Sequence, residues 1–169
     1  MKGAKTLFSS SSDEWETPNW VYNQLNDEFH FVYDAACLPV NMKCQFGSCH
    51  SDALFNNWGD PAFCNPPYSK IAKFMKKAYE EGLTGKTVVC LIPARCDTRY
   101  WHEYCMKASE IRLIKGRLKF ENRTLPSWRE DGSHKTSSAT FPSAIIVFDE
   151  RMTRINHEYP KLVAMEVKK

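Results

Sequence analysis

The sequence lacks any apolar run that approaches the roughly 20 residues needed to span a bilayer. The first twelve residues also lack an apolar stretch of the kind that a secretory signal contains. These absences argue against a membrane or exported protein, and we expect one that acts in the cytoplasm. With 169 residues, the chain has room for one domain with a substantial core and little more.

A disulfide framework and a metal-ligand spacing are absent as well. The chain has seven cysteines, an odd number at irregular intervals, and without an export signal we expect reduced thiols. Cys44, Cys49 and His50 lack a CxxC pair and an obvious fourth ligand, which disfavours a zinc site. Small, buried, apolar side chains are the simpler interpretation of these cysteines, and we expect no metal.

The chain carries little net charge, +3 at neutral pH, which neither demands nor excludes a nucleic-acid partner. The basic residues are unevenly spread, however: between positions 95 and 123, eight Lys or Arg stand against four acidic residues. This stretch predicts a local basic face, although such runs are often ordinary solvated surface. Nothing in the sequence indicates an oligomeric state.

The polar segments divide the chain into three parts. Residues 1–14 include a serine run and predict a flexible arm, residues 15–150 form the domain, and residues 151–169 form a C-terminal tail. Within the domain, residues 121–142 are polar and contain Pro126, Gly132 and Pro142, so we expect a long loop. A loop of this length is either functional or disordered.

Strand-like and helix-like patterns alternate along the domain. The apolar residues after Ser69 recur at positions 71, 74, 75, 78 and 79, which is the spacing of an amphipathic helix ending at Gly82. The patterns predict helices at 17–28, 69–82 and from 98, a helical turn at 41–44, and strands at 29–33, 61–64, 87–92, 111–114, 118–120 and 144–148. The pattern is weak at 45–57.

This alternation predicts an α/β fold: a three-layer sandwich with a compact, mostly parallel sheet. In such sheets, ligands bind beyond the carboxyl ends of the strands. Asp34, Asn65 and the segment 93–95 each follow an expected strand. We therefore expect these positions to meet at one edge of the sheet.

The four residues Asn65, Pro66, Pro67 and Tyr68 carry the clearest chemical signal. An amino group conjugated to an aromatic ring attacks poorly because its lone pair is delocalised. The side-chain oxygen of Asn65 and the backbone carbonyl of Pro66 can hold such an NH2 group and localise the lone pair. The prolines stiffen the turn, and Tyr68 can stack on the base. A plain strand terminator is the alternative, but a strand before the turn and a helix after it favour function.

Six stretches, taken in order, resemble the phage-type DNA N6-adenine methyltransferase family, a Dam-like group. They are DEWETP at 13–18, DAAC at 34–37, FCNPPY at 63–68, TVVCLIPARCDT at 87–98, IRLIKGRLKF at 111–120 and FPSAIIVF at 141–148. The resemblance implies a Rossmann-like methyltransferase fold, S-adenosylmethionine as methyl donor, and adenine in double-stranded DNA as acceptor. It also assigns the catalytic turn to residues 65–68.

The same resemblance implies where the donor binds. The implied contacts are Trp15, Thr17, Pro18, Asp34, Ala35, Cys37, Asp52 and Asn65. A carboxylate at Asp34 suits the sulfonium and amino groups of the donor, and the small side chains of Ala35 and Ala36 permit close approach. Free NH groups at the helix start near Thr17 suit its carboxylate. The alternatives are a turn residue for Asp34, an ordinary cap for Thr17 and a solvated loop residue for Asp52.

Two features depart from the family pattern. No glycine-rich turn follows the strand before Asp34. Only 31 positions separate Asp34 from Asn65, which is too few for two or three full strand–helix units, since one crossover takes at least about 10–12 residues. Part of the usual sheet must therefore be absent or reduced.

An adenine amino group inside a duplex is paired, so the base must be flipped out before methylation. Basic side chains near the site would hold phosphates. The DNA-binding candidates are Arg95, Asp97, Arg99, Arg117, Lys119 and Phe120, with Lys115 as a further cation. An internal Arg95–Asp97 ion pair and core packing of Phe120 are the alternatives. A recognition loop at 121–140 would add Arg123, Trp128, Arg129, His134 and Lys135.

Two other functions compete with DNA methylation. The same turn could serve transfer to an RNA base or to the amide of a protein glutamine, because any planar NH2 fits it. A catalytically inactive nucleic-acid-binding protein of the same fold is the second alternative. The complete turn at 65–68 argues against an inactive protein, and the positive net charge argues against a DNA mimic.

Overall fold

The computed structural model describes residues 16–39, 41–49, 52–121, 136–139, 141–151 and 160–166. Within these residues, seven strands form one sheet in the spatial order β2-β1-β3-β4-β8-β5-β9. Their bounds are β1 Tyr33–Cys37, β2 Phe46–Cys49, β3 Ala62–Cys64, β4 Val88–Pro93, β5 Glu110–Ile114, β8 Ser143–Phe148 and β9 Lys161–Met165. A separate two-stranded ribbon pairs β6 (Lys119–Glu121) with β7 (Thr136–Ser138).

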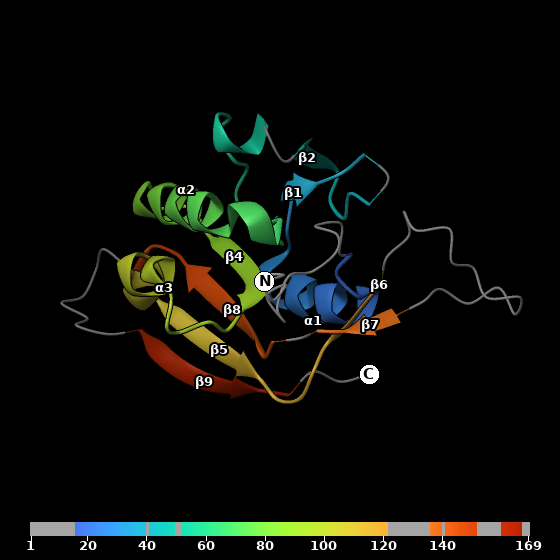
Figure 1. Ribbon diagram of the computed structural model, residues 1–169. Coiled ribbons are helices and arrows are strands. Elements are labelled where there is room, and N and C mark those ends of the chain that lie inside the picture. The colour runs from blue at the N-terminus through green and yellow to red at the C-terminus, as the bar shows by residue number, and fades with distance from the viewer. Residues whose placement is uncertain are drawn as a thin grey trace, which may run out of the picture.

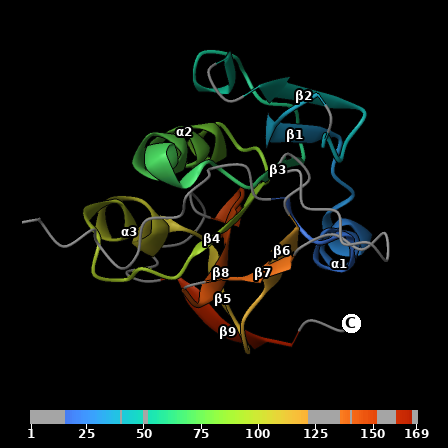
Figure 2. The same ribbon diagram turned by 45° about the vertical axis from the view of Figure 1, so that its right-hand side comes forward.

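Helices cover both faces of the sheet, so the described chain is a three-layer sandwich (Figures 1 and 2). One face carries α1 (Asn19–Phe29), and the other carries α2 (Ile71–Leu83) and α3 (Arg99–Glu103). Short 3-10 turns stand at η1 (Asp52–Leu54), η2 (Tyr68–Lys70) and η3 (Cys105–Lys107). The predicted α/β class and layering are confirmed.

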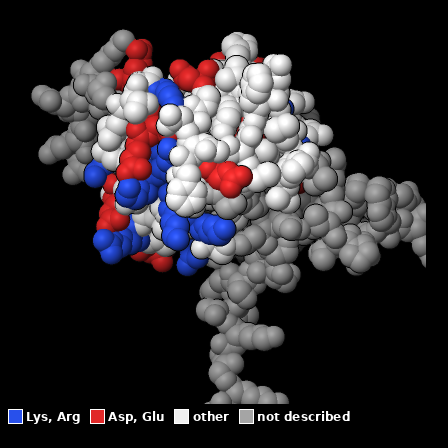
Figure 3. Space-filling model, turned by 90° about the horizontal axis from the view of Figure 1, so that it is seen from above, with Lys and Arg blue, Asp and Glu red and all other residues white. Residues whose placement is uncertain are grey.

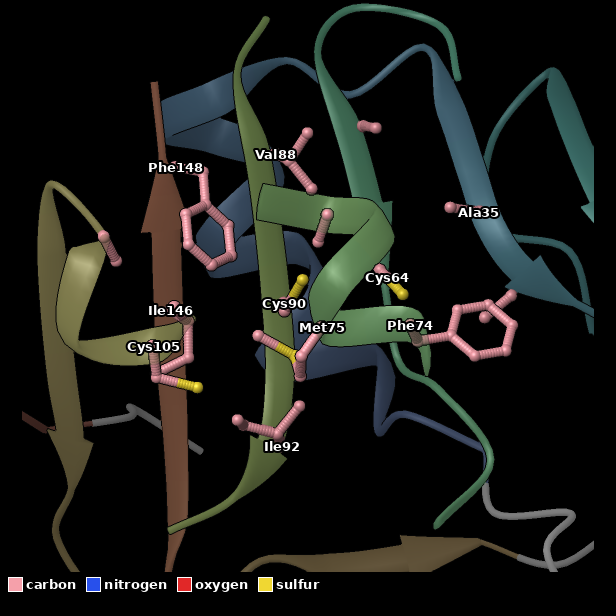
Figure 4. Packing of buried hydrophobic residues seen from close by; sticks show 14 of the residues in the cluster. Ala35, Cys64, Phe74, Met75, Val88, Cys90, Ile92, Cys105, Ile146 and Phe148 are labelled. Atoms are coloured by element: carbon pink, nitrogen blue, oxygen red, sulfur yellow. The ribbon is translucent and has the colours of Figure 1, made fainter. Parts of the chain in front are cut away.

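The core lies on both faces of β4, whose six residues are all buried. Val88, Cys90 and Ile92 face α2 and α3, whereas Val89 and Leu91 face α1. Figure 4 shows Phe74 and Met75 of α2 projecting toward the side of the sheet that carries Cys64 and Cys90. Burying a Phe, Leu or Met side chain contributes roughly 1.5–3 kcal/mol, so this double-sided packing holds β4 at the centre of the sheet.

Strand direction decides which ends share an edge. β1, β3 and β4 pair in parallel, and β8 runs antiparallel to both β4 and β5. Because β5 is antiparallel to β8, it runs in the same direction as β4. The carboxyl ends of β1, β3, β4 and β5 therefore lie at one edge, as the sequence predicts for residues 65 and 93–95.

The N-terminal elements begin later than predicted. The N-cap of α1 is Pro18 and not Thr17, and no side chain caps the helix. The helix continues through Phe29 and ends at His30, which has a left-handed φ of 53°. Asn26 Oδ1 then accepts the Phe31 N–H at 2.9 Å. Since β1 starts only at Tyr33, Asp34 lies inside the strand, and the prediction that it follows the strand end is wrong.

Several other predicted boundaries also change. The expected helical turn at 41–44 does not form: residues 42 and 43 have no regular structure, and the Asn41 N–H donates back to the Leu38 carbonyl at 3.0 Å. The 45–57 region contains β2 and η1, and part of the expected loop at 121–142 pairs as β7. The tail contributes β9, which pairs in parallel with β5. The helix predicted from residue 69 begins at Ile71, with Lys70 at the N-cap position and no side-chain cap, and Gly82 lies inside it.

Candidate active site

The turn that follows β3 is rigid and largely buried. β3 ends at Cys64, and both Pro66 and Pro67 are buried directly after Asn65. Pro67 is extended at φ −60° and ψ 131°, and its carbonyl accepts the Lys70 N–H at 3.0 Å, which starts η2. The turn thus enters a helix within one residue and has little freedom to rearrange.

Asn65 is oriented by a residue far away in the sequence. Its amide nitrogen donates to Thr17 Oγ1 at 3.0 Å. Thr17 is buried at 3% exposure and precedes α1. The Thr17 hydroxyl therefore contacts the turn after β3, while Pro18 holds the N-cap position of α1. With the amide nitrogen donating to Thr17, the oxygen on the other arm of the amide is an acceptor group.

Asn65 and Thr17 line a small pocket that opens to solvent. The wall of the pocket is formed by the segment before α1, by β1 and the turn after it, and by β3. Its lining residues are Glu16, Thr17, Asp34, Ala36, Cys37, Asn41, Lys43, Phe63 and Asn65. The parallel pairing of β1 with β3, which places Asp34 opposite Phe63, brings these segments together.

Asp34 is the most perturbed acid in this pocket. It is 4% exposed, and burial raises its pKa from 3.8 to about 6. The backbone N–H groups of Lys43, at 3.0 Å, and Ala36, at 3.4 Å, donate to its two oxygens and oppose that rise. Two backbone amides orient this carboxylate, but burial leaves it poorly solvated. A cationic ligand would stabilise its negative charge.

The Lys43 side chain connects the turn after β1 to the start of α1 and the segment before it. Its ammonium donates to Glu16 Oε1 at 2.7 Å and to Asn19 Oδ1 at 2.6 Å. Glu16 and Lys43 are 6% and 12% exposed, so solvent screens this ion pair weakly. The pocket therefore presents two carboxylates and one ammonium at the start of α1, where the helix N-terminus adds partial positive charge.

Tyr68 follows the prolines on η2. Desolvation raises the pKa of its phenol above the usual range, and the neighbouring Tyr100 of α3 adds to the effect. The phenol therefore stays protonated and neutral at physiological pH. A neutral aromatic ring at this position is suited to stacking on a planar base.

Comparison with known proteins identifies the family. A family model described as DNA N-6-adenine-methyltransferase (Dam) matches residues 4–167. The chain belongs to this family. It is 28% identical over 148 residues to the DNA N-6-adenine-methyltransferase of Haemophilus phage HP1, an alignment that covers 84% of this chain and 82% of the relative. It is 33% identical over 110 residues to the enzyme of that name from Escherichia phage T1, covering 63% of this chain and 46% of the relative.

The structure brings together some of the expected donor contacts of this Dam-family chain and separates others. Thr17, Asp34, Cys37 and Asn65 line one pocket. Ala35 points the other way and packs against the α2 side of the sheet (Figure 4). The remaining expected contacts lie off this lining: Pro18 is buried at the start of α1, Asp52 is exposed on η1, and Trp15 lies outside the described residues.

Pocket residues that the sequence did not single out are Glu16, Asn41, Lys43 and Phe63. Lys43 reaches the site because β2 pairs with β1 and folds the intervening turn back over Asp34. This contact depends on the parallel pairing of the four-residue strand β2 with β1, and no local sequence pattern indicates that pairing.

The residues of the Dam-family chain that are expected to contact DNA differ in exposure and in their ion-pair partners. Arg95 is exposed, and its guanidinium lies 5.0 Å from the Phe141 ring centre. No Arg95–Asp97 ion pair occurs in the described chain, and Asp97 is exposed. Arg99 pairs with Glu103 at 2.5 Å but remains 89% exposed.

Arg117 and Lys119 are exposed beyond β5, whereas Phe120 is 3% exposed and packs in the core on the α1 side of the sheet. The side chain of Phe120 is therefore a core residue and not a stacking surface. The recognition-loop residues 122–135 lie outside the described chain. Lys115 pairs with Glu166 at 2.7 Å.

Two features are absent from the described residues. Across them, no group of three or more His, Cys, Asp or Glu side chains could hold a metal ion. None of the helices in the same residues is long and apolar enough to cross a membrane.

Proposed function

We propose that the chain transfers a methyl group from S-adenosylmethionine to the N6 amino group of an adenine flipped out of double-stranded DNA. Family membership supports adenine methylation in DNA. The observation that carries the mechanism is the Asn65–Thr17 hydrogen bond beside the pocket that contains Asp34.

The charges of the pocket fit the methyl donor. S-adenosylmethionine carries a sulfonium, an ammonium and a carboxylate. Asp34 and Glu16 would attract the two cationic groups, while Lys43 and the N-terminus of α1 would attract the carboxylate. A pocket with one sign of charge would fit only part of this molecule, so the mixed set supports the assignment. When bound, the donor supplies an electrophilic methyl group.

Asn65 and the Pro66 carbonyl would accept hydrogen bonds from the adenine N6 amino group. This draws the nitrogen toward a tetrahedral shape and directs its lone pair at the methyl carbon. The new bond joins N6 to that carbon while the carbon–sulfur bond breaks, its electron pair returns to sulfur, and a proton then leaves N6 to solvent. Alignment of this kind can supply roughly 7–11 kcal/mol of a barrier.

The pocket and the Asn-Pro-Pro-Tyr turn would also accept an RNA base or a protein glutamine amide. Radiolabelled methyl transfer to duplex DNA, RNA and a glutamine-containing protein separates these substrates. We expect label in DNA, and digestion of that DNA should yield N6-methyladenine. Label in RNA or protein alone would overturn the proposal, and a chain that binds no donor would favour the inactive binding protein. Because the substrate is DNA and the relatives come from phages, we expect the reaction to take place in the cytoplasm of a bacterial host.

A further inference from the structure

The basic side chains divide into those with a carboxylate partner and those without one. In the described chain, most Lys and Arg pair with Asp or Glu. The described cations that make no such pair are Lys70, Lys73, Arg95, Lys107, Arg117 and Lys119. Lys107 lies over the Tyr79 ring, 5.2 Å from its centre, before β5 begins.

The other unpaired cations share one location. Lys70 and Lys73 follow β3, Arg95 follows β4, and Arg117 and Lys119 follow β5. These strands run in the same direction, so all five positions lie at the carboxyl edge that also carries Asn65. The described cations without a carboxylate partner therefore lie mainly at the edge of the sheet that carries Asn65. Most described cations elsewhere are paired with a carboxylate.

Lys70 and Lys73 stand where helix electrostatics disfavours a cation. Lys70 caps α2, Lys73 lies in its first turn, and no acidic residue occupies that turn. A cation at a helix N-terminus is unfavourable because the helix dipole is positive there. Further along α2, Lys76 pairs with Glu80, and Lys77 pairs with Glu81. Figure 3 shows Lys, Arg, Asp and Glu interleaved on the side where α2 and α3 lie, next to a mostly uncharged surface.

We propose that Lys70 and Lys73 bind the phosphate backbone of DNA on one flank of the target nucleotide, while Arg117 and Lys119 bind it on the other. This rests on the proposed function. β3 and β5 are separated by β4 and β8, and at about 4.8 Å per strand the two pairs are anchored about 14 Å apart. That span is close to the roughly 12 Å width of the DNA major groove, so one duplex can reach both.

The test compares the double variant Lys70→Gln/Lys73→Gln with Lys76→Gln on the same helix. Binding to a short fluorescein-labelled DNA duplex is followed by anisotropy over a series of KCl concentrations. Each lost phosphate contact should lower the slope of log K against log salt by about 0.9, so the double variant should lose about 1.8. Lys76→Gln should keep the wild-type slope, because Glu80 already neutralises that lysine.

Calorimetric titration with S-adenosylmethionine should give the wild-type affinity for both variants, since none of the three lysines lines the donor pocket. A double variant with the wild-type slope would overturn the proposal, as would a wild-type chain that binds duplex RNA more tightly than duplex DNA or binds no DNA. If the wild-type chain binds DNA but transfers no methyl group, the proposed activity is wrong. The salt-dependence slope of the double variant then still tests whether Lys70 and Lys73 bind phosphates.

Discussion

Asp34 shows how a single residue can couple the site to the stability of the fold. Its side chain is 4% exposed, and burial raises its pKa from 3.8 to about 6. Because the folded state binds the proton more tightly than the unfolded chain, the protonated form stabilises the fold. That contribution is complete below about pH 4 and is lost as the pH rises to about 6.

We therefore predict that the free energy of unfolding falls by about 2 kcal/mol between pH 4 and pH 6 through Asp34 alone. Urea unfolding of the wild type and of Asp34→Asn at both pH values isolates this contribution. The variant should lose that part of the pH dependence. An identical pH dependence in the two proteins would contradict the raised pKa.

Tyr100 provides a second prediction for one residue. Its hydroxyl is buried and makes no hydrogen bond within the described residues. Removing a buried hydroxyl that lacks a partner removes its desolvation cost. Tyr100→Phe should therefore leave the free energy of unfolding unchanged or raise it by up to about 1 kcal/mol in urea unfolding. A loss of more than about 1 kcal/mol would show that the hydroxyl has a partner.

Residues in local patterns could be predicted from sequence, and residues placed by distant contacts could not. Asn65 stands out because two prolines and a tyrosine follow it, and Asp34 because an apolar segment precedes it. Lys43 carries no such signal, and its place depends on partners 27 and 24 positions away, Glu16 and Asn19.

At the scale of elements, α2 is tied to the strands around it through one buried carboxylate. Glu81, at 4% exposure, accepts from Lys77 at 2.6 Å, from Lys86 at 2.5 Å and from the Trp58 backbone N–H at 3.4 Å. Lys86 also donates to the Trp58 carbonyl at 2.7 Å. This network joins the end of α2 to the segments before β3 and β4.

Adjacent glutamates allow a matched test of that network. Glu81→Gln leaves two partly buried ammonium groups without their carboxylate, so the free energy of unfolding should fall by roughly 3 kcal/mol. Glu80→Gln removes only an exposed pair with Lys76 and should leave the free energy of unfolding close to the wild-type value. Urea unfolding measures both. Equal losses in the two variants would contradict the network.

Strong periodic patterns predicted elements well, and weak patterns did not. The patterns locate α2, β4 and β8 to within about two residues because these elements bury a regular apolar face. β2 and β9 expose much of their length at the two edges of the sheet, so their side chains show no clear alternation. The strand predicted at 29–33 lies before the observed β1, because the aromatic segment at 29–33 has a stronger strand pattern than the small residues at 35–37.

At the scale of the whole molecule, the short spacing between Asp34 and Asn65 predicted that full strand–helix units would not fit there, and the described residues between β1 and β3 hold only β2 and η1. The described sheet nevertheless has seven strands. β2 is the only strand between β1 and β3 along the described chain, and it pairs in parallel on the outer side of β1. β1 and β3 then become direct neighbours. The donor pocket and the catalytic turn thus form from adjacent strands, with the segment before α1 supplying Thr17 at their shared edge.

The account depends on Asn65 as the hydrogen-bond acceptor for the target amino group, and single-turnover methyl transfer to duplex DNA tests this most directly. Asn65→Ala should slow transfer by about 10²–10³-fold, while DNA affinity stays at the wild-type value. Asn57→Ala, at an exposed position outside the pocket, serves as the control and should keep the wild-type rate. A folded Asn65→Ala variant that methylates adenine at the wild-type rate would contradict the mechanism.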